Sequence, residues 1–173
     1  MRSWVFALAV LASCVGACAA GCGDGDFTTV DARFSTPEHT VQTLLGAFGV
    51  RERSQEQIRA QLATQGSLRL QNRVDYEACF TDFAQPGGEG LAGYVLGMLA
   101  AAKDELRYET FEDHAYVFPR EGVRVVMRRE AGAYRIVLSE SVPDEVRRGL
   151  IGVEAAANER ARLGTPLGRE QAP

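Results

Sequence analysis

The sequence lacks the short motifs by which enzymes and cofactor-binding domains are usually found. Its 173 residues contain no glycine-rich phosphate loop, no G-x-S-x-G nucleophile elbow and no His, Asp and Glu set at metal-ligand spacing. Histidine is scarce, with only His39 and His114, and Lys103 is the sole lysine. The formal net charge of −4 disfavours nucleic acid as a partner, because phosphate binding depends on clustered positive charge. We therefore expect no metal, no cofactor and no nucleic acid.

Charge is also missing from the N-terminus, where none occurs between Arg2 and Asp24. An apolar run from Trp4 to Val10 follows the arginine, and small residues follow the run. A basic start, an apolar stretch and small residues before the cut are the layout of a secretory signal peptide. A transmembrane helix needs about 20 predominantly apolar residues, and here Gly, Ser, Ala and Cys replace the large apolar residues before that length is reached. The sequence therefore predicts export.

Cysteines repeat at a spacing of four at the end of this segment, in LASCVGACAAGCGDGD. Zinc sites usually have C-x-x-C pairs or histidine partners, and only Cys79 lies elsewhere to form a disulfide. The stretch instead resembles a bacterial lipoprotein signal, in which small residues precede a cysteine that is diacylated and becomes the new N-terminus. The resemblance implies lipid attachment at Cys22, since the polar residues 23–26 follow at once. Cys18 and Cys14 are the alternatives, and a cleaved signal without lipid is another.

These assignments divide the chain into a lipoprotein signal peptide (1–21), a flexible tether (22–34), a single α+β domain (35–163) and a disordered tail (164–173). The lipid implies a membrane as partner and the bacterial cell envelope as location. After cleavage Cys79 is the one cysteine outside the lipid site. We expect it to be a buried, inert core residue, because free cysteine is among the most buried residue types.

The domain begins with a helical pattern and continues with an alternating one. Apolar residues at helical spacing, capping residues and glycine or proline breaks predict helices over 37–49, 54–62 and 90–105, a short irregular or helical stretch over 74–83, and a last helix over 143–163. The apolar stripe of the third helix, which includes Tyr94 and Met98, is interpreted as core.

Period-two alternation predicts strands over 107–118, 123–130 and 133–140. The turn at 131–132 is either a two-residue turn, which places Arg128 opposite Arg135, or a three-residue loop with a bulge, which avoids that pair. Helices followed by such a meander predict an α+β fold. Its N-terminal helices pack on a curved antiparallel sheet of at least three strands, and a C-terminal helix follows.

Two segments, STPEHTVQTLLGAF and VRVVMRREAGAYRIVLSESVP, are similar to the first helix and last strands of exported nuclear transport factor 2-like (SnoaL-type) domains. Tyr134 stands where that family commonly has tryptophan, and residues 64–106 do not match its pattern. The resemblance implies a cone-like fold with a pocket between the concave sheet face and the helices. The family uses this pocket in isomerases, dehydratases, cyclases, lipid carriers and inert scaffolds, so the fold does not determine the function.

One polar cluster stands at strand spacing within 107–118 and consists of Tyr108, Glu112, His114 and Tyr116. If this face lines the cone, His114 is a candidate general base oriented by Glu112, with the tyrosines donating hydrogen bonds to an anionic intermediate. If Phe111, Ala115 and Val117 face inward instead, His114 and Glu112 are solvated. Sheets commonly keep one polar, water-facing side, which favours the second arrangement.

A second group is basic and consists of Arg124, Arg128, Arg129, Arg135, Arg147 and Arg148. It predicts either a patch for an acidic lipid headgroup or protein partner, or arginines paired with nearby carboxylates on a solvated face. Pairing is the commoner arrangement.

The leading hypothesis is a membrane-anchored envelope lipoprotein with a small non-catalytic domain that binds a small molecule or an envelope protein. A carrier of a hydrophobic ligand such as phospholipid is the second hypothesis. An isomerase- or dehydratase-type enzyme using His114 is the third. The face of residues 107–118 that meets the helices discriminates among them.

Overall fold

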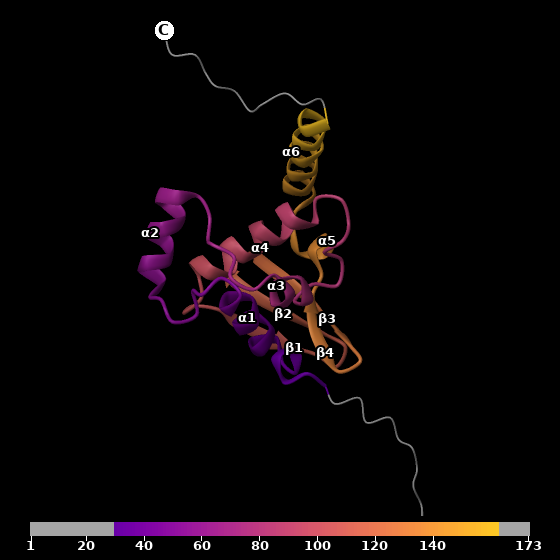
Figure 1. Ribbon diagram of the computed structural model, residues 1–173. Helices are drawn as coiled ribbons and strands as arrows, with labels where there is room; N and C mark the ends of the chain where they lie inside the picture. The colour runs from indigo at the N-terminus through magenta and orange to yellow at the C-terminus, as the bar shows by residue number, and fades with distance from the viewer. Residues whose placement is uncertain (1–29, 163–173) are drawn as a thin grey trace, which may run out of the picture.

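A four-stranded antiparallel sheet, in the order β1-β2-β3-β4, forms one layer of the fold. The structure, a computed structural model, describes residues 30–162, so the predicted signal, most of the tether and the predicted tail lie outside the described residues. The strands are β1 (Arg107–Thr110), β2 (His114–Arg120), β3 (Val123–Glu130) and β4 (Ala133–Ile136). The helices are η1 (Ala32–Phe34), α1 (Pro37–Gly46), α2 (Gln55–Gln65), α3 (Arg73–Ala78), α4 (Gly88–Ala101), α5 (Leu138–Ser141) and α6 (Asp144–Arg162). The predicted α+β class is confirmed (Figure 1).

Helix α1 begins as its sequence predicts and carries one apolar face. The Thr36 side chain accepts a hydrogen bond from the His39 N–H at 3.2 Å, and Pro37 fills the first helical position, where no partner for its nitrogen is needed. Thr40 on the buried face donates from Oγ1 to the Tyr134 carbonyl at 2.8 Å. This bond fixes α1 against β4, and Leu44 on the same face is fully buried.

The core lies between α1, α4 and one face of the sheet. Residues that are 0% exposed on the sheet side are Ala115, Val117, Val125, Met127 and Ile136. The helices contribute Leu44 from α1 and Leu91, Val95 and Leu99 from α4, each also 0% exposed. The register of β2 against β3 shifts between Val117 and Arg120, and such a bulge bends a sheet. The bent face is filled by packed side chains.

Residues 107–118, predicted as one strand, are two strands joined by a tight turn. Thr110 pairs with Ala115, and the Phe111 N–H donates to the His114 carbonyl at 2.9 Å. Glu112 and Asp113 are the turn residues between them. Across this turn, even-numbered residues of β1 lie on the same sheet face as odd-numbered residues of β2. An alternating pattern that runs without a break through the sequence therefore changes face at the turn. The prediction was wrong because the polar pair Glu112-Asp113 keeps the period-two pattern while reversing the chain.

The predicted strand over 133–140 is also shorter than expected. It ends at Ile136, and Leu138–Ser141 form α5. The Asp82 carboxylate accepts hydrogen bonds from the Leu138 and Ser139 N–H groups at 2.8 and 2.9 Å, which satisfies the first donors of this helix. A side chain 56 residues away in sequence therefore decides where the strand stops.

The two-residue turn at Ala131-Gly132 is the one that forms. Both residues have positive φ, 48° and 84°, as a type I′ hairpin requires. Arg128 is consequently opposite Arg135. The Glu140 carboxylate lies 3.1 Å from the Arg128 guanidinium, and this nearby negative charge reduces the repulsion between the arginines.

Helices α2 and α6 lie at the periphery. In Figure 1, α2 stands apart at the left and α6 projects at the top. Ile58 is the one buried residue of α2, and among the described side chains of α6 none is fully buried. Capping accounts for the ends of α2, since Ser54 and Gln57 form a reciprocal capping box and Gly66 ends the helix at φ 69°. Helix α2 is therefore held by few apolar contacts.

Ser141 ties α5 to the sheet, so replacing it tests the fold. Its Oγ accepts from the Val126 N–H at 2.9 Å and donates to the Val137 carbonyl at 2.6 Å, and it is 4% exposed. Ser141→Ala leaves a buried N–H unpaired, which costs about 1–3 kcal/mol. We expect that loss of unfolding free energy in a urea titration. Ser139→Ala in the same helix is the control and should change it by less than about 0.5 kcal/mol. Equal effects of the two variants would contradict the assigned role of Ser141.

Candidate functional site

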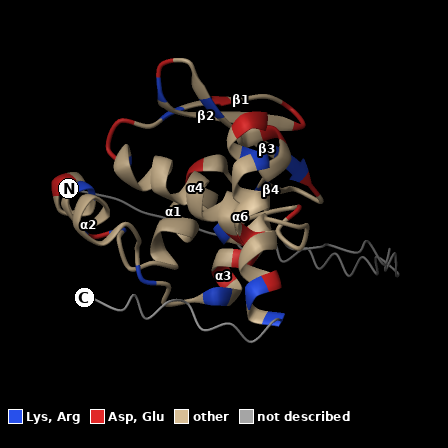
Figure 2. Ribbon diagram, turned by 90° about the horizontal axis from the view of Figure 1, so that it is seen from above, with Lys and Arg blue, Asp and Glu red and all other residues tan. Residues whose placement is uncertain are grey.

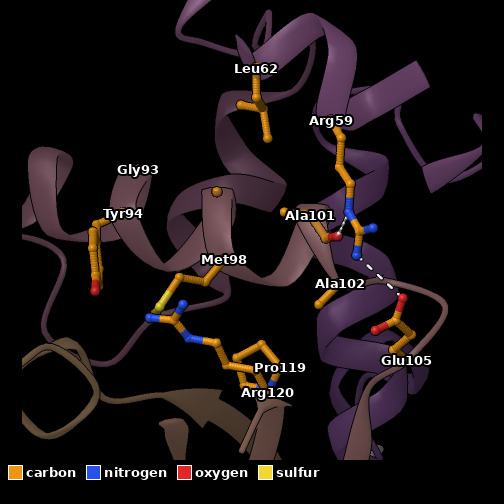
Figure 3. A pocket seen from close by; sticks show the side chains of 11 residues that line it. Arg59, Leu62, Gly93, Tyr94, Met98, Ala101, Ala102, Glu105, Pro119 and Arg120 are labelled. Carbon is orange, nitrogen blue, oxygen red and sulfur yellow. Dashed lines mark hydrogen bonds and ion pairs between the residues drawn. The ribbon is translucent and has the colours of Figure 1, made fainter. Parts of the chain in front are cut away.

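A hollow with a mostly apolar lining lies between α2 and α4. It has a volume of about 550 Å³, within the usual range for sites that bind small molecules. Its lining residues are Arg59 and Leu62 from α2, Gly93, Tyr94, Gly97, Met98 and Ala101 from α4, Ala102 and Glu105 after α4, and Pro119 and Arg120 from β2. Figure 3 shows Leu62 pointing from α2 toward α4, with Met98 and Arg120 side by side below. The hollow lies outside the packed core.

A second hollow adjoins the first. It measures about 380 Å³ and shares Leu62, Gly93 and Gly97 with the first. Phe48, Leu68, Leu70, Tyr76 and Leu96 supply most of its remaining apolar lining. The two hollows are therefore adjacent, and we call them the two chambers of the α2–α4 groove, with the half-buried Leu62 side chain in the lining of both.

Two glycines make the floor of this groove. Gly93 and Gly97 are interior residues of α4 and stand one helical turn apart. A Cβ built on either one meets no atom within 4 Å, so close packing does not require glycine at these positions. Glycine inside a helix costs roughly 0.5–1 kcal/mol relative to alanine. Their effect is to leave open the space that side chains would otherwise fill.

One end of the groove is closed by a polar cluster. Arg59 Nε donates to the Ala101 carbonyl at 2.8 Å, and its Nη2 lies 3.3 Å from Glu105 Oε1 (Figure 3). Gln55 Nε2 donates to the same carboxylate oxygen at 2.7 Å. The hydrogen bond from Gln55, and then the charge of Arg59, hold the pKa of Glu105 below its usual value. This cluster fastens the N-terminal half of α2 to the end of α4, while the other half borders the chambers.

Charged side chains in the groove lining are Arg59, Glu105 and Arg120 in the first chamber and Glu89 in the second. Figure 2 shows α1 and α4 almost wholly without charged residues, whereas acidic and basic residues gather on the loops, at strand ends and on α6. Among residues 30–162, Arg59 pairs with Glu105 and Glu89 pairs with Arg73, whereas Arg120 has no carboxylate within ion-pair distance. Between these charged groups the lining is mostly apolar.

The polar cluster predicted on residues 107–118 does not come together. His114 and Tyr116 lie on the sheet face away from the core, because Ala115 and Val117 face inward. Tyr108 lies on the opposite, inner face, since it pairs with Val117. Burial, and then the charge of Glu38, raise the pKa of Tyr108 to about 12. The arrangement in which Ala115 and Val117 face inward is thus the one that forms.

The groups around His114 also differ from those expected. Its Nδ1 lies 2.6 Å from the Asp113 carboxylate, and that hydrogen bond lowers the pKa of Asp113. Glu112 is an exposed turn residue. Phe111, expected on the inner face, is 48% exposed and stacks on the His114 ring at 4.6 Å. His114 lines neither chamber of the α2–α4 groove.

Comparison with family models finds no match, nor does comparison with curated proteins or with solved structures. The resemblance to nuclear transport factor 2-like domains therefore stays a prediction. No helix within residues 30–162 is long and apolar enough to span a membrane. In the same range, no three His, Cys, Asp or Glu side chains are grouped so as to hold a metal ion.

Sequence reasoning missed the α2–α4 groove because it interpreted the α4 stripe as core. Leu91, Val95 and Leu99 of that stripe are buried, but Tyr94 and Met98 border the groove. The signal that was available is the pair Gly93 and Gly97 inside a strongly helical pattern. From the sequence alone, however, such glycines are equally compatible with close helix packing.

Cys79 is buried, as predicted, and tests the packing between α1, α3 and β4. It is 0% exposed, and its Sγ lies 3.1 Å from the Asp75 carbonyl. Burial raises the pKa of its thiol to about 12, so at pH 8 the reactive thiolate is absent from the native state. We expect iodoacetamide to modify Cys79 in urea but at least 100-fold more slowly in buffer, measured by mass spectrometry. Comparable rates would show that this packing opens readily.

Proposed function

We propose that this chain is a membrane-anchored lipoprotein of the bacterial cell envelope whose folded domain binds a small apolar molecule in the α2–α4 groove without catalysing a reaction. The binding role rests on the floor formed by Gly93 and Gly97. Glycine at these positions lowers the stability of α4, yet no neighbouring atom lies close enough to require it. The anchoring role is supported by the sequence of the signal and by Cys22, with Cys18 and Cys14 as the alternatives.

The position and lining of the groove support a ligand rather than a second protein. The hollow is concave, and its apolar wall is contributed by α4 and Leu62. Helix α2, which forms the other wall, is held by Ile58 and by the Arg59–Glu105 cluster. An apolar molecule in the chambers would bury Tyr94 and Met98, which are now half-buried, and the burial of apolar surface supplies about 25 cal/mol per Å².

A carrier of a hydrophobic molecule, such as a phospholipid, is the second candidate. The adjacency of the two chambers favours it, because a long acyl chain needs more room than one chamber alone provides. The ligand would lie between α2 and α4, since the sheet–helix interface is filled by core side chains. An isomerase or dehydratase using His114 is disfavoured, because His114 faces away from the groove.

Filling the groove tests the binding role. All the fully buried side chains among the described residues lie between Phe34 and Val142, so a chain beginning at Gly23 keeps the whole core. We expect this chain to bind the neutral fluorophore N-phenyl-1-naphthylamine and Gly97→Leu to weaken binding at least tenfold, measured by fluorescence titration. The variant should fold at least as stably, because leucine is a better helix former than glycine.

Gly149→Leu is the matched control, since Gly149 is also a helical glycine with open space around its Cα but lies on α6. It should bind the fluorophore as the unchanged chain does. Equal binding by the Gly97→Leu variant, or no binding by the unchanged chain, would contradict the proposed ligand site.

The anchor is tested on the full chain expressed in a bacterium. We expect mass spectrometry of the membrane fraction to show a new N-terminus at Cys22 that carries acyl chains, and Cys22→Ser to abolish both the cleavage and the acylation. Acyl chains on Cys18 or Cys14 would move the attachment site. A soluble, unacylated product would overturn the lipoprotein assignment.

A further inference from the structure

The sheet face away from the core carries a ladder of aromatic rings. His114, Tyr116 and Phe118 follow one another along β2, with ring centroids 5.1 and 6.3 Å apart. Phe111 extends the ladder at the turn by stacking on His114 at 4.6 Å. Neither α1 nor α4 covers this face, because both pack on the other side of the sheet.

Arginines from the neighbouring strands lie over these rings. The Arg107 guanidinium of β1 is 5.5 Å from the centroid of Phe118, and that of Arg124 in β3 is 5.1 Å from the centroid of Tyr116. By register, Arg128 continues the same face beside His114, and Arg135 follows on β4 with its guanidinium over the ring of Phe34 at 5.4 Å. We call the set Arg107, His114, Tyr116, Phe118, Arg124, Arg128 and Arg135, together with Phe111, the outer sheet face.

Both signs of charge occur on this face, with four arginines and two glutamates at its strand positions. Among residues 30–162, Arg107 and Arg124 have no carboxylate within ion-pair distance. By register, Glu109 and Glu130 are the acidic residues of this face, while Asp113 contacts His114 at the turn and Glu140 pairs with Arg128. Of the two arrangements predicted for the arginines, Arg128 therefore shows pairing with a carboxylate, whereas Arg124 is available to bind an anion.

The start of the described chain lies at one end of the outer sheet face. Val30 lies against the β3–β4 turn, so close that a Cβ on Gly132 would come within 2.5 Å of its Cγ2. The Phe111–His114 turn is at the same end, since the Tyr134 hydroxyl lies 3.4 Å from the Phe111 carbonyl. The chain from Cys22 to Val30 spans roughly 30 Å at most when extended. A lipid on Cys22 therefore keeps this end of the sheet near the membrane surface.

We infer that the outer sheet face rests on an anionic phospholipid surface, with Arg107 and Arg124 on the phosphates and Phe111, Tyr116 and Phe118 at headgroup level. Aromatic rings favour that depth of a membrane, and each arginine near an anionic surface adds attraction that salt screens. This inference rests on the proposed anchor at Cys22, which supplies the proximity. It leaves the α2–α4 groove facing away from the lipid, on the helical side of the sheet.

The test uses the chain beginning at Gly23, which has no anchor and no tryptophan, because Trp4 is the only one in the sequence. It is mixed with vesicles of equal parts phosphatidylglycerol and phosphatidylcholine, or of phosphatidylcholine alone, and sedimented. We expect binding to the anionic vesicles only, lost in molar salt. The double variant R107Q/R124Q should bind more than tenfold more weakly, since each charge contributes about fivefold.

The control R51Q/R69Q removes the same charge from exposed arginines on the helical side and should bind within about threefold of the unchanged chain, a loss smaller than one surface-contacting charge would cause. Phe111→Trp adds a reporter, whose emission should shift to shorter wavelength on anionic vesicles and be quenched by brominated lipid. Val74→Trp, at a position on α3 that is 74% exposed, should show neither effect.

Equal binding to neutral vesicles, equal loss in both double variants, an unchanged emission from the vesicle-bound Phe111→Trp variant, or no binding at all would each overturn the assignment of this face. None of these results bears on the acyl chains seen by mass spectrometry or on fluorophore binding in the α2–α4 groove. Failure of the surface and failure of the proposed function are therefore separable.

Discussion

Ala115 and Val117 of β2 and Val125 and Met127 of β3 are shielded completely from solvent, and the other features depend on this one buried face. Because the sheet is antiparallel, side chains that alternate along each strand divide cleanly between core and solvent. Because these four side chains are buried against α1 and α4, His114, Tyr116 and the strand arginines lie on the opposite face of the sheet. The same packing fills the space between the sheet and the helices, and the hollow described above lies instead between α2 and α4.

The α2–α4 groove follows from how few apolar residues α2 provides. With Ile58 as its one buried side chain, α2 cannot close over α4 along its whole length, and the glycines on α4 offer no side chains to fill the gap. The Arg59–Glu105 pair holds one end of α2. Since both groups are half or more exposed to solvent, this pair contributes little stability and serves mainly to position the helix.

The molecule thus presents two surfaces of different chemistry on opposite sides of its sheet. The helical side carries an apolar hollow with few charges, whereas the outer sheet face carries aromatic rings overlaid by arginines. In the proposed function the first holds a ligand. In the further inference the second lies on the membrane, so the groove opens away from the lipid headgroups.

Local patterns in the sequence determined much of the fold. The caps at Thr36 and Ser54, the apolar faces of α1 and α4 and the Ala131-Gly132 turn predict elements that depend on neighbouring residues only. The burial of Cys79 also followed from residue type. Tertiary contacts decided most of the rest. The Glu112-Asp113 turn separated Tyr108 from His114, and the Asp82 carboxylate ended β4 and began α5. The Glu112-Asp113 turn is local, but its polar residues keep the period-two pattern, so alternation did not reveal it. The Asp82 contact joins atoms that meet only after the chain has folded. The groove has the same origin, because an empty space between two helices is a property of their packing and not of either sequence.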